Sequence, residues 1–108
     1  MTLRADDRVL LLDIPSDREL TAMARILMKG VLVAIGSRDQ VDFARAAMAE
    51  FDNVMFVEAS PQQIPWREQY FTKIVVPPHM EAVLRSSGAE LHRVLAAGGE
   101  ILVQTDTT

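Results

Sequence analysis

At 108 residues, with 49% hydrophobic and 24% charged residues, the chain has the composition of one globular domain, residues 1–108. Eleven Lys and Arg against fifteen Asp and Glu give a net charge of −4, and the basic residues are spread along the chain, which argues against binding to nucleic acid or to a membrane surface. There is no cysteine, which removes disulfide and thiolate chemistry and predicts a cytoplasmic location, and no apolar run approaches the roughly 18 residues of a membrane span.

The first element is an apolar run that ends in a polar turn. Val9–Ile14 is apolar except for Asp13, which predicts a strand buried on both faces. The chain then turns polar after Pro15, which predicts a tight turn into a helix. In a parallel α/β sheet, a nucleotide-type ligand binds at such a turn. This turn contains no glycine.

The remaining elements alternate between strands and helices. The predicted strands are Val9–Ile14, Val31–Ile35, Val54–Val57, Phe71–Val76 and Glu100–Gln104. Capping-box spacing marks the first two helix starts, and the predicted helices are Ser16–Gly30, Ser37–Phe51 and Pro78–Ala97, the last interrupted near Ser86-Ser87-Gly88. Glu58–Tyr70 contains two prolines and is predicted to be irregular, and residues 105–108 are predicted to fray. This order predicts an α/β fold with a doubly wound parallel sheet and right-handed crossovers.

Three segments carry a resemblance to a known family. Glu90–Val103 resembles a helix-turn-strand signature, E-L-x-R-V-L-x-P-G-G, with Ala97 where the signature has proline. Ile64–Val76 is similar to the family's fourth strand and the stretch that leads into it. Asn53–Val57 is similar to the family's third strand. The match is collinear from Val9 to Val103, and on it the chain resembles a class I S-adenosylmethionine-dependent methyltransferase domain. The resemblance implies a Rossmann-like five-stranded sheet in the order 3-2-1-4-5.

The turn that holds the cofactor in this family departs from the pattern here. In the family the first strand ends in L-D-x-G-x-G-x-G, whose glycines let the backbone approach the cofactor. Asp13 fits the start of that motif, but Pro15, Asp17 and Glu19 stand at the three glycine positions. Proline lacks an N–H, and the two acidic residues add bulk and negative charge where the methionyl carboxylate would lie.

Two more cofactor positions of the family are changed. Gly36 stands where an acidic residue holds the ribose hydroxyls, and Asp39 lies one helical turn too late to replace it. The aspartate that contacts adenine would fall near Ser60. We therefore expect little or no cofactor binding and no catalytic residue. The vestigial cofactor-binding positions are Asp13, Pro15, Asp17, Glu19, Gly36 and Ser60.

The other candidate residues favour structural roles. Asp13 is expected to steady its turn by accepting backbone N–H bonds, and Trp66, Tyr70 and Phe71 are expected to pack a loop onto the sheet rather than to line a pocket. His79 and His92 have no cysteine or clustered carboxylate to complete a metal site, so no metal is predicted. His79 is expected to serve at the surface or as a cap.

Full-size methyltransferases continue after the fifth strand with a helix and an antiparallel hairpin, and often carry a helix before the first strand. This chain is expected to lack both. The two early helices are expected to cover one face of the sheet, while the other apolar face has only the Pro78–Ala97 helix and the Glu58–Tyr70 loop. This incompletely covered face and the open edge strand Glu100–Gln104 predict a homodimer formed face to face or by joined fifth strands.

Three functions remain open from the sequence. The first is a non-catalytic methyltransferase-like domain that acts as an interaction or assembly module. The second is an S-adenosylmethionine-dependent enzyme whose site is completed by a partner, with Asp13 and Asp39 as surviving site residues. The third is a protein that binds a different small ligand in a crevice beside Gly36, Ser60 and Trp66.

Overall fold

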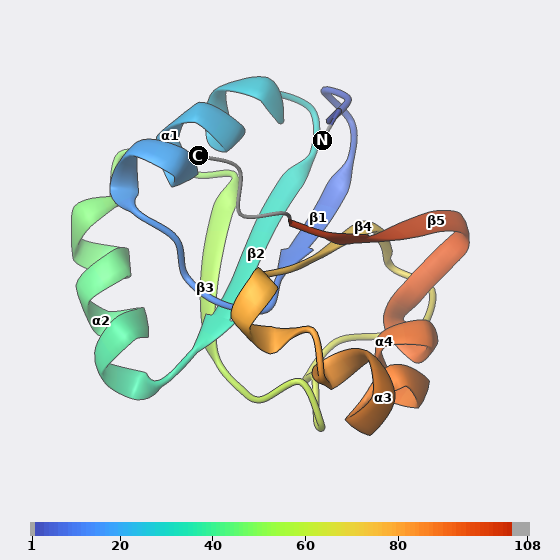
Figure 1. The fold of residues 1–108 in the computed structure, drawn as a ribbon. Coiled ribbons are helices and arrows are strands. Elements are labelled where there is room, and N and C mark those ends of the chain that lie inside the picture. Colours follow the sequence, from blue (N-terminus) through green and yellow to red (C-terminus); the bar gives the residue numbers. More distant parts are fainter. Residues whose placement is uncertain (1, 105–108) are drawn as a thin grey trace.

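The computed structural model describes residues 2–104 and contains a parallel sheet of five strands in the order β3-β2-β1-β4-β5 (Figure 1). The strands are β1 Arg8–Leu11, β2 Val31–Gly36, β3 Val54–Glu58, β4 Phe71–Val76 and β5 Leu95–Val103. The fold class and the strand order that the sequence predicts are confirmed. The predicted frayed tail, residues 105–108, lies outside the described residues.

Two amphipathic helices, α1 (Asp17–Ile26) and α2 (Arg38–Ala47), cover one face of the sheet (Figure 1). Each begins at a predicted serine cap. The box at Ser37 is complete, whereas at Ser16 only the serine side chain acts as a cap. Their inward residues bury the α1 side of β1, β2 and β3 in a cluster that includes Val9, Leu11, Leu20, Met23, Leu32, Ala34, Val41, Ala44 and Phe56.

The helix predicted over Pro78–Ala97 is interrupted near Ser86-Ser87-Gly88, as the sequence predicts, but it also begins as a separate 3-10 turn and ends earlier, at Val94. The chain forms a 3-10 turn η1 (Pro78–Met80), a short α3 (Val83–Ser86) and α4 (Gly88–Val94). Proline begins the first of these pieces, and the Ser87-Gly88 junction separates the other two. The apolar residues of this segment keep helical spacing, but three short helical pieces bury them instead of one continuous helix.

The fifth strand begins earlier than predicted and contains an irregularity. Leu95 already pairs with Phe71, and the regular ladder resumes where Glu100 pairs with Lys73. The extra residues between these pairs bulge out, and Gly98 has a φ of +77°, a conformation that glycine adopts without strain. The predicted strand Glu100–Gln104 is therefore the regular part of β5, whose last strand residue is Val103.

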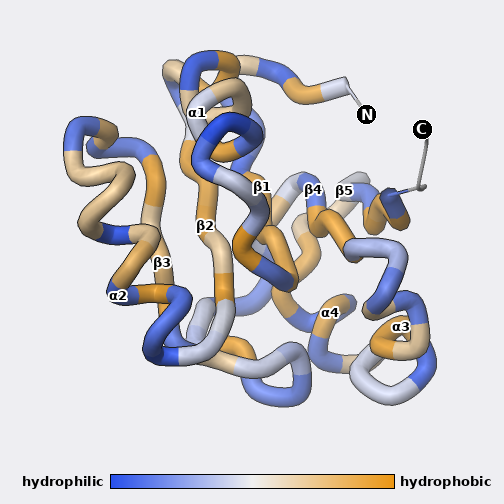
Figure 2. The backbone as a smooth tube through the Cα atoms, turned by 60° about the vertical axis from the view of Figure 1, so that its left-hand side comes forward, coloured by the Kyte–Doolittle hydropathy of each residue, from blue (hydrophilic) through white to orange (hydrophobic). Residues whose placement is uncertain are grey.

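The second face of the sheet is covered better than the sequence indicated. Leu10, Val33 and Ile35 on this face are at most 1% exposed. The irregular segment after β3 and helix α4 supply the cover, through residues that include Ile64, Trp66, Leu91 and Val94. The tube coloured by hydropathy shows apolar stretches along β2, in the middle of the fold (Figure 2). The expectation of an incompletely covered apolar face is thus not met at the centre of the sheet. In residues 2–104 no helix is long and apolar enough to cross a bilayer.

Candidate functional site

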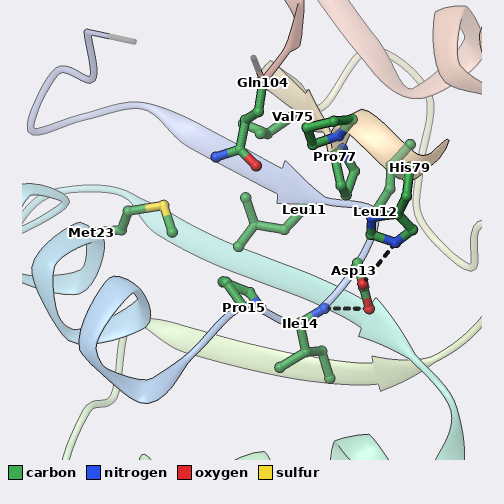
Figure 3. Close-up of a pocket in the computed structure, with 11 residues that line it drawn as sticks. Leu11, Leu12, Asp13, Ile14, Pro15, Met23, Val75, Pro77, His79 and Gln104 are labelled. Carbon is green, nitrogen blue, oxygen red and sulfur yellow. Dashed lines mark hydrogen bonds and ion pairs between the residues drawn. The ribbon is translucent and has the colours of Figure 1, made fainter. Parts of the chain in front are cut away.

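The carboxyl end of β1 carries the first candidate residue, Asp13. Its Oδ1 accepts the N–H of Ile14 at 2.8 Å, which confirms the predicted role in steadying the turn. The same oxygen lies 3.4 Å from Nε2 of Gln40. The other oxygen, Oδ2, lies 3.2 Å from Nε2 of His79 (Figure 3). Both carboxylate oxygens of Asp13 therefore already have partners within the chain.

The space beside Gly36, at the end of β2, is filled by two side chains. A Cβ placed on Gly36 would lie 2.8 Å from Oε1 of Gln40 and 3.1 Å from Cδ1 of Ile14. The Gln40 oxygen is held there because it accepts the N–H of Ser37 at 2.9 Å and so closes the α2 capping box. Any side chain at Gly36 would have to displace Ile14 or break that cap.

Helix α1 begins immediately after this turn and carries its own negative charge. The Ser16 hydroxyl accepts the N–H of Glu19 at 3.3 Å. Asp17 and Glu19 stand exposed in the first turn, at the positive end of the helix dipole. The helix start is therefore stabilised from within the chain, and an incoming anion would meet two carboxylates.

A cavity of about 220 Å³ lies between β1 and β4, on the α1 side of their carboxyl ends (Figure 3). Ligand pockets in proteins typically measure about 300–1,000 Å³, so this one fits only a small molecule. Its walls are apolar except for Asp13, His79 and Gln104, and the other lining residues are Leu11, Leu12, Ile14, Pro15, Met23, Val75, Pro77 and Pro78. No serine, threonine or cysteine nucleophile is among these described residues.

The crevice predicted beside Gly36, Ser60 and Trp66 is not one cavity. Ser60 lines a separate hollow of about 460 Å³ with Glu58, Glu90 and Arg93, which includes neither Gly36 nor Trp66. Trp66 packs instead against the rings of Tyr70 and Phe71, with ring centroids 5.9 and 5.7 Å away. The three aromatic residues pack the irregular loop onto the sheet, as the sequence predicts.

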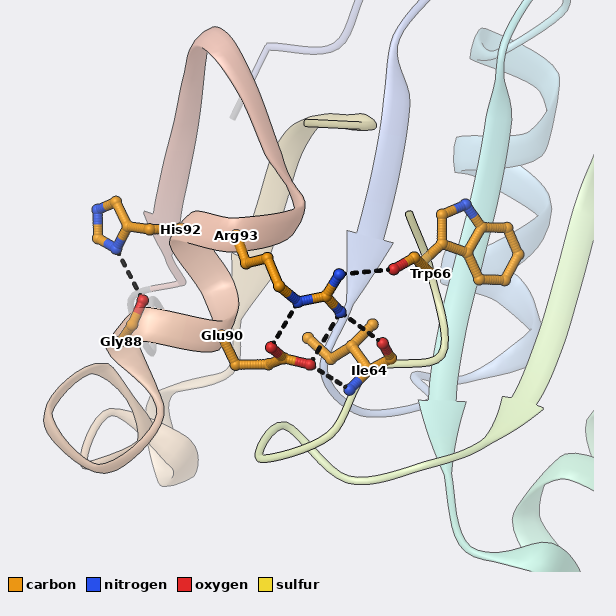
Figure 4. Close-up of polar contacts among 6 residues, drawn as sticks. All are labelled: Ile64, Trp66, Gly88, Glu90, His92 and Arg93. Carbon is orange, nitrogen blue, oxygen red and sulfur yellow. Dashed lines mark hydrogen bonds and ion pairs between the residues drawn. The ribbon is translucent and has the colours of Figure 1, made fainter. Parts of the chain in front are cut away.

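A charged clamp ties that loop to α4 (Figure 4). Arg93 donates to the carbonyls of Trp66 and Ile64 at 2.9 and 2.8 Å, and Glu90 accepts the N–H of Ile64 at 2.7 Å. The Arg93 side chain and the Ile64 N–H bond the Glu90 carboxylate and lower its pKa from 4.5 to about 2. The same ion pair raises the pKa of Arg93. This clamp replaces the backbone hydrogen bonds that the loop cannot make for itself.

A second carboxylate, Asp7, is buried at the amino-terminal end of the parallel strands, opposite the end that carries the candidate site. Burial opposes its ionisation, but the Arg4 N–H, the Thr72 hydroxyl and the Lys73 ammonium outweigh that cost and lower its pKa. The Thr72 hydroxyl donates to Oδ1 at 2.8 Å, and the Lys73 nitrogen lies 3.6 Å from the same oxygen. Asp7 fastens the start of β1 to β4, away from the candidate site.

The remaining predicted residues lie apart. The side chain of His79 is 66% exposed and lies 3.2 Å from Asp13, while His92 bonds the Gly88 carbonyl through Nδ1 at 2.8 Å. Asp39 is exposed in the first turn of α2. Within residues 2–104 no three His, Cys, Asp or Glu side chains are grouped to hold a metal ion. The contacts that the sequence did not reveal are Ile14 beside Gly36 and His79 beside Asp13, both of which depend on tertiary placement.

No family model and no curated protein matches the chain, whereas several solved structures do. An S-adenosylmethionine-dependent methyltransferase from Aquifex aeolicus matches with a TM-score of 0.79 and 17% identity, over 97% of this chain and 62% of that one. The [4+2]-cyclase SpnF matches with a TM-score of 0.78 and 22% identity, over 94% and 39%. A chain of the complex between the Haloferax volcanii Trm112 methyltransferase activator and a putative methyltransferase matches with a TM-score of 0.78 and 19% identity, over 95% of this chain and 46% of that one.

The chain has a methyltransferase-like fold. It spans between 39 and 62% of the length of these three structures. The TM-scores establish the methyltransferase-like fold, and at identities of 17–22% they establish nothing beyond the fold. One of the three is named as a cyclase, so this fold does not determine the reaction.

Proposed function

We propose that this methyltransferase-like domain is non-catalytic and acts as an interaction or assembly module. The observation that supports the proposal best is the packing of Ile14 and Gln40 against Gly36. In the family that the chain resembles, an acidic side chain at this position holds the ribose. Here the same space is taken by apolar and capping side chains, so the residues present do not fit S-adenosylmethionine.

The β1–α1 turn supports the same proposal. Backbone N–H groups that bind a ligand must be unobstructed and must not face like charge. Pro15 has no N–H to offer, and the Asp13 carboxylate is engaged by Ile14, Gln40 and His79. A ligand carboxylate would also approach Asp17 at the helix start. Each lost charge-assisted hydrogen bond weakens binding by about 1.5–3 kcal/mol, so a few of them remove a micromolar site.

Titration calorimetry with S-adenosylmethionine and S-adenosylhomocysteine tests this proposal. We expect no saturable heat up to millimolar ligand from protein that a melting curve shows to be folded. Micromolar affinity for either nucleotide would overturn the non-catalytic reading and favour an enzyme. If saturable heat appeared only after a partner protein was added, the site would be completed by that partner.

Binding of a different small ligand is the second candidate, and the 220 Å³ cavity between β1 and β4 favours it. Its apolar walls with Asp13, His79 and Gln104 at the rim suit a compact apolar molecule that carries one hydrogen-bonding group. A thermal-shift screen of small metabolites and nucleotides tests this candidate. Protection that is lost in a Val75→Trp variant, which fills the cavity, would support it.

Homodimerisation is part of the proposed assembly role. An interaction module needs a surface that remains accessible after the chain has folded. The strand β5 offers one, because it forms an edge of the sheet. We expect a light-scattering mass of two chains at micromolar concentration. A mass of one chain throughout the micromolar range would contradict the dimer without reviving the enzyme. The absence of cysteine suits a cytoplasmic setting, which stays a prediction.

A further inference from the structure

The outer edge of β5 carries backbone groups that no other strand within residues 2–104 pairs. Among the described strands β5 has one neighbour, β4, and the Gln104 N–H donates to the Val76 carbonyl at 2.9 Å (Figure 1). Alternate residues of a strand direct their N–H and C=O to opposite sides. The backbone groups of Leu102 therefore face β4 like those of Gln104, and those of Ile101 and Val103 face away from the sheet.

Apolar side chains accompany these free backbone groups. Val103 is 38% exposed, and Ile101 and Leu102 are half-buried. Leu102 pairs with Val75 and so lies on the α1 side of the sheet, while Ile101 pairs with Ile74 and lies on the α4 side. An additional strand at this edge would find apolar surface on both of its faces.

We propose that a second copy of this chain covers the edge, with the two β5 strands antiparallel about a two-fold axis through Leu102. This inference rests on the assembly role proposed above and names its surface. In that register Ile101 of each copy lies opposite Val103 of the other. Since both residues direct N–H and C=O outward, each of these two pairs exchanges two hydrogen bonds, four in all. The two Leu102 side chains meet across the axis on the α1 side.

Charge also fits this register. Glu100 is the one charged residue of segment 100–104, and it would lie opposite Gln104 of the other copy, whose amide can donate to a carboxylate. No like charges face each other within the segment. A two-fold axis at Ile101 or at Val103 would instead pair only one outward-facing residue with its own copy within this segment.

The alternative dimer surface, the second face of the sheet, is already occupied. The loop after β3 and α4 bury Leu10, Val33 and Ile35 to 1% exposure or less. Face-to-face association would need this cover to leave, whereas pairing through β5 needs no rearrangement. The edge is therefore the surface that a second copy can reach.

A matched pair of substitutions at Val103 tests the backbone contact. Val103→Pro and Val103→Ala both remove the exposed side chain, but only proline removes the outward N–H. That N–H makes no bond to β4, so the fold tolerates its loss, and melting curves check this. By sedimentation velocity we expect Val103→Pro to raise the dimer dissociation constant about tenfold or more relative to Val103→Ala, because two intermolecular hydrogen bonds are lost. Equal dissociation constants for the two folded variants would overturn the proposed pairing.

Disulfide trapping supplies a second readout that does not depend on the proline variant. The chain has no cysteine, and residues facing each other in a non-hydrogen-bonded antiparallel pair lie close enough for a disulfide. We expect Leu102→Cys to form a covalent dimer on mild oxidation, while Met28→Cys, at a site that is 80% exposed and remote in sequence, stays monomeric under the same oxidising conditions at equal concentration. A dimer by light scattering with no trapping at Leu102 would refute this surface alone. A monomeric wild type would refute the dimer, and neither result bears on cofactor binding.

Discussion

Replacement of Glu90 by glutamine tests the clamp that holds the loop over the second face of the sheet. The carboxylate accepts from Ile64 and Arg93, and its pKa falls from 4.5 to about 2 in the folded chain. A tenfold change in acid strength equals about 1.4 kcal/mol, so this fall corresponds to about 3 kcal/mol. The side chains of Glu90 and Arg93 are 19% and 33% exposed, and solvent screening reduces the expected loss to about 1–2 kcal/mol.

The sign of the pH dependence follows from the same shift. A carboxyl whose folded pKa is lowered contributes its full stability above its unfolded pKa, and loses it as the pH falls toward the folded value. We expect Glu90→Gln to be less stable than wild type at pH 7, and the gap to shrink between pH 4.5 and about 2, the two pKa values of Glu90.

Urea unfolding followed by the fluorescence of Trp66, the one tryptophan, measures both quantities. Glu50→Gln is the control, since Glu50 is exposed and forms no side-chain bond among residues 2–104. A Glu90→Gln variant as stable as the control at pH 7, or a gap that does not change on acidification, would refute the reasoning.

Two further predictions concern close packing at glycines. Gly36→Ala should lower the free energy of unfolding in urea by about 1 kcal/mol, because the new Cβ would press on the Ile14 side chain. The loss should be smaller in an Ile14→Ala background, and purely additive losses would contradict the packing of Ile14 against Gly36. Gly30→Ala should unfold the chain or cost more than about 3 kcal/mol, because its Cβ would come 2.0 Å from the Asp7 carbonyl oxygen, whereas Gly88→Ala, with open space around it, should be neutral or stabilising by up to about 1 kcal/mol in thermal unfolding. Equal effects at Gly30 and Gly88 would contradict that close approach.

The strands were predictable because their signal is local. Val31–Ile35 and Val54–Val57 are short apolar runs bounded by polar turns, and alternation with helices leaves few topologies for them. After β4, Ser86-Ser87-Gly88 marks the break between α3 and α4, but the apolar spacing does not show that Pro78–Met80 forms a separate 3-10 turn or that α4 ends at Val94. The start of β5 was missed because Leu95 pairs before a bulge that depends on Gly98.

For the candidate site, the sequence predicts only which positions differ from the cofactor motifs of the family that the chain resembles. The sequence places Gly36 and Pro15 where the family has an acid and a glycine, but it does not say what fills the resulting space. Ile14 reaches Gly36, and His79 reaches Asp13, through contacts between neighbouring parallel strands and their loops. The sequence names the Glu58–Tyr70 loop and the Pro78–Ala97 helix as the elements over the second face. It does not show how complete their cover is, because a loop without periodicity gives no sign that residues such as Ile64 will be buried.

Ile14 packs against Gly36, in the space that the ribose-holding acidic side chain takes in the family that the chain resembles. A crystal structure of the full chain grown with millimolar S-adenosylmethionine measures this directly. We predict that Ile14 remains packed against Gly36 and that no nucleotide density lies above the β1–α1 turn. A nucleotide seated above Ile14, with Gln40 displaced from its cap, would contradict the account.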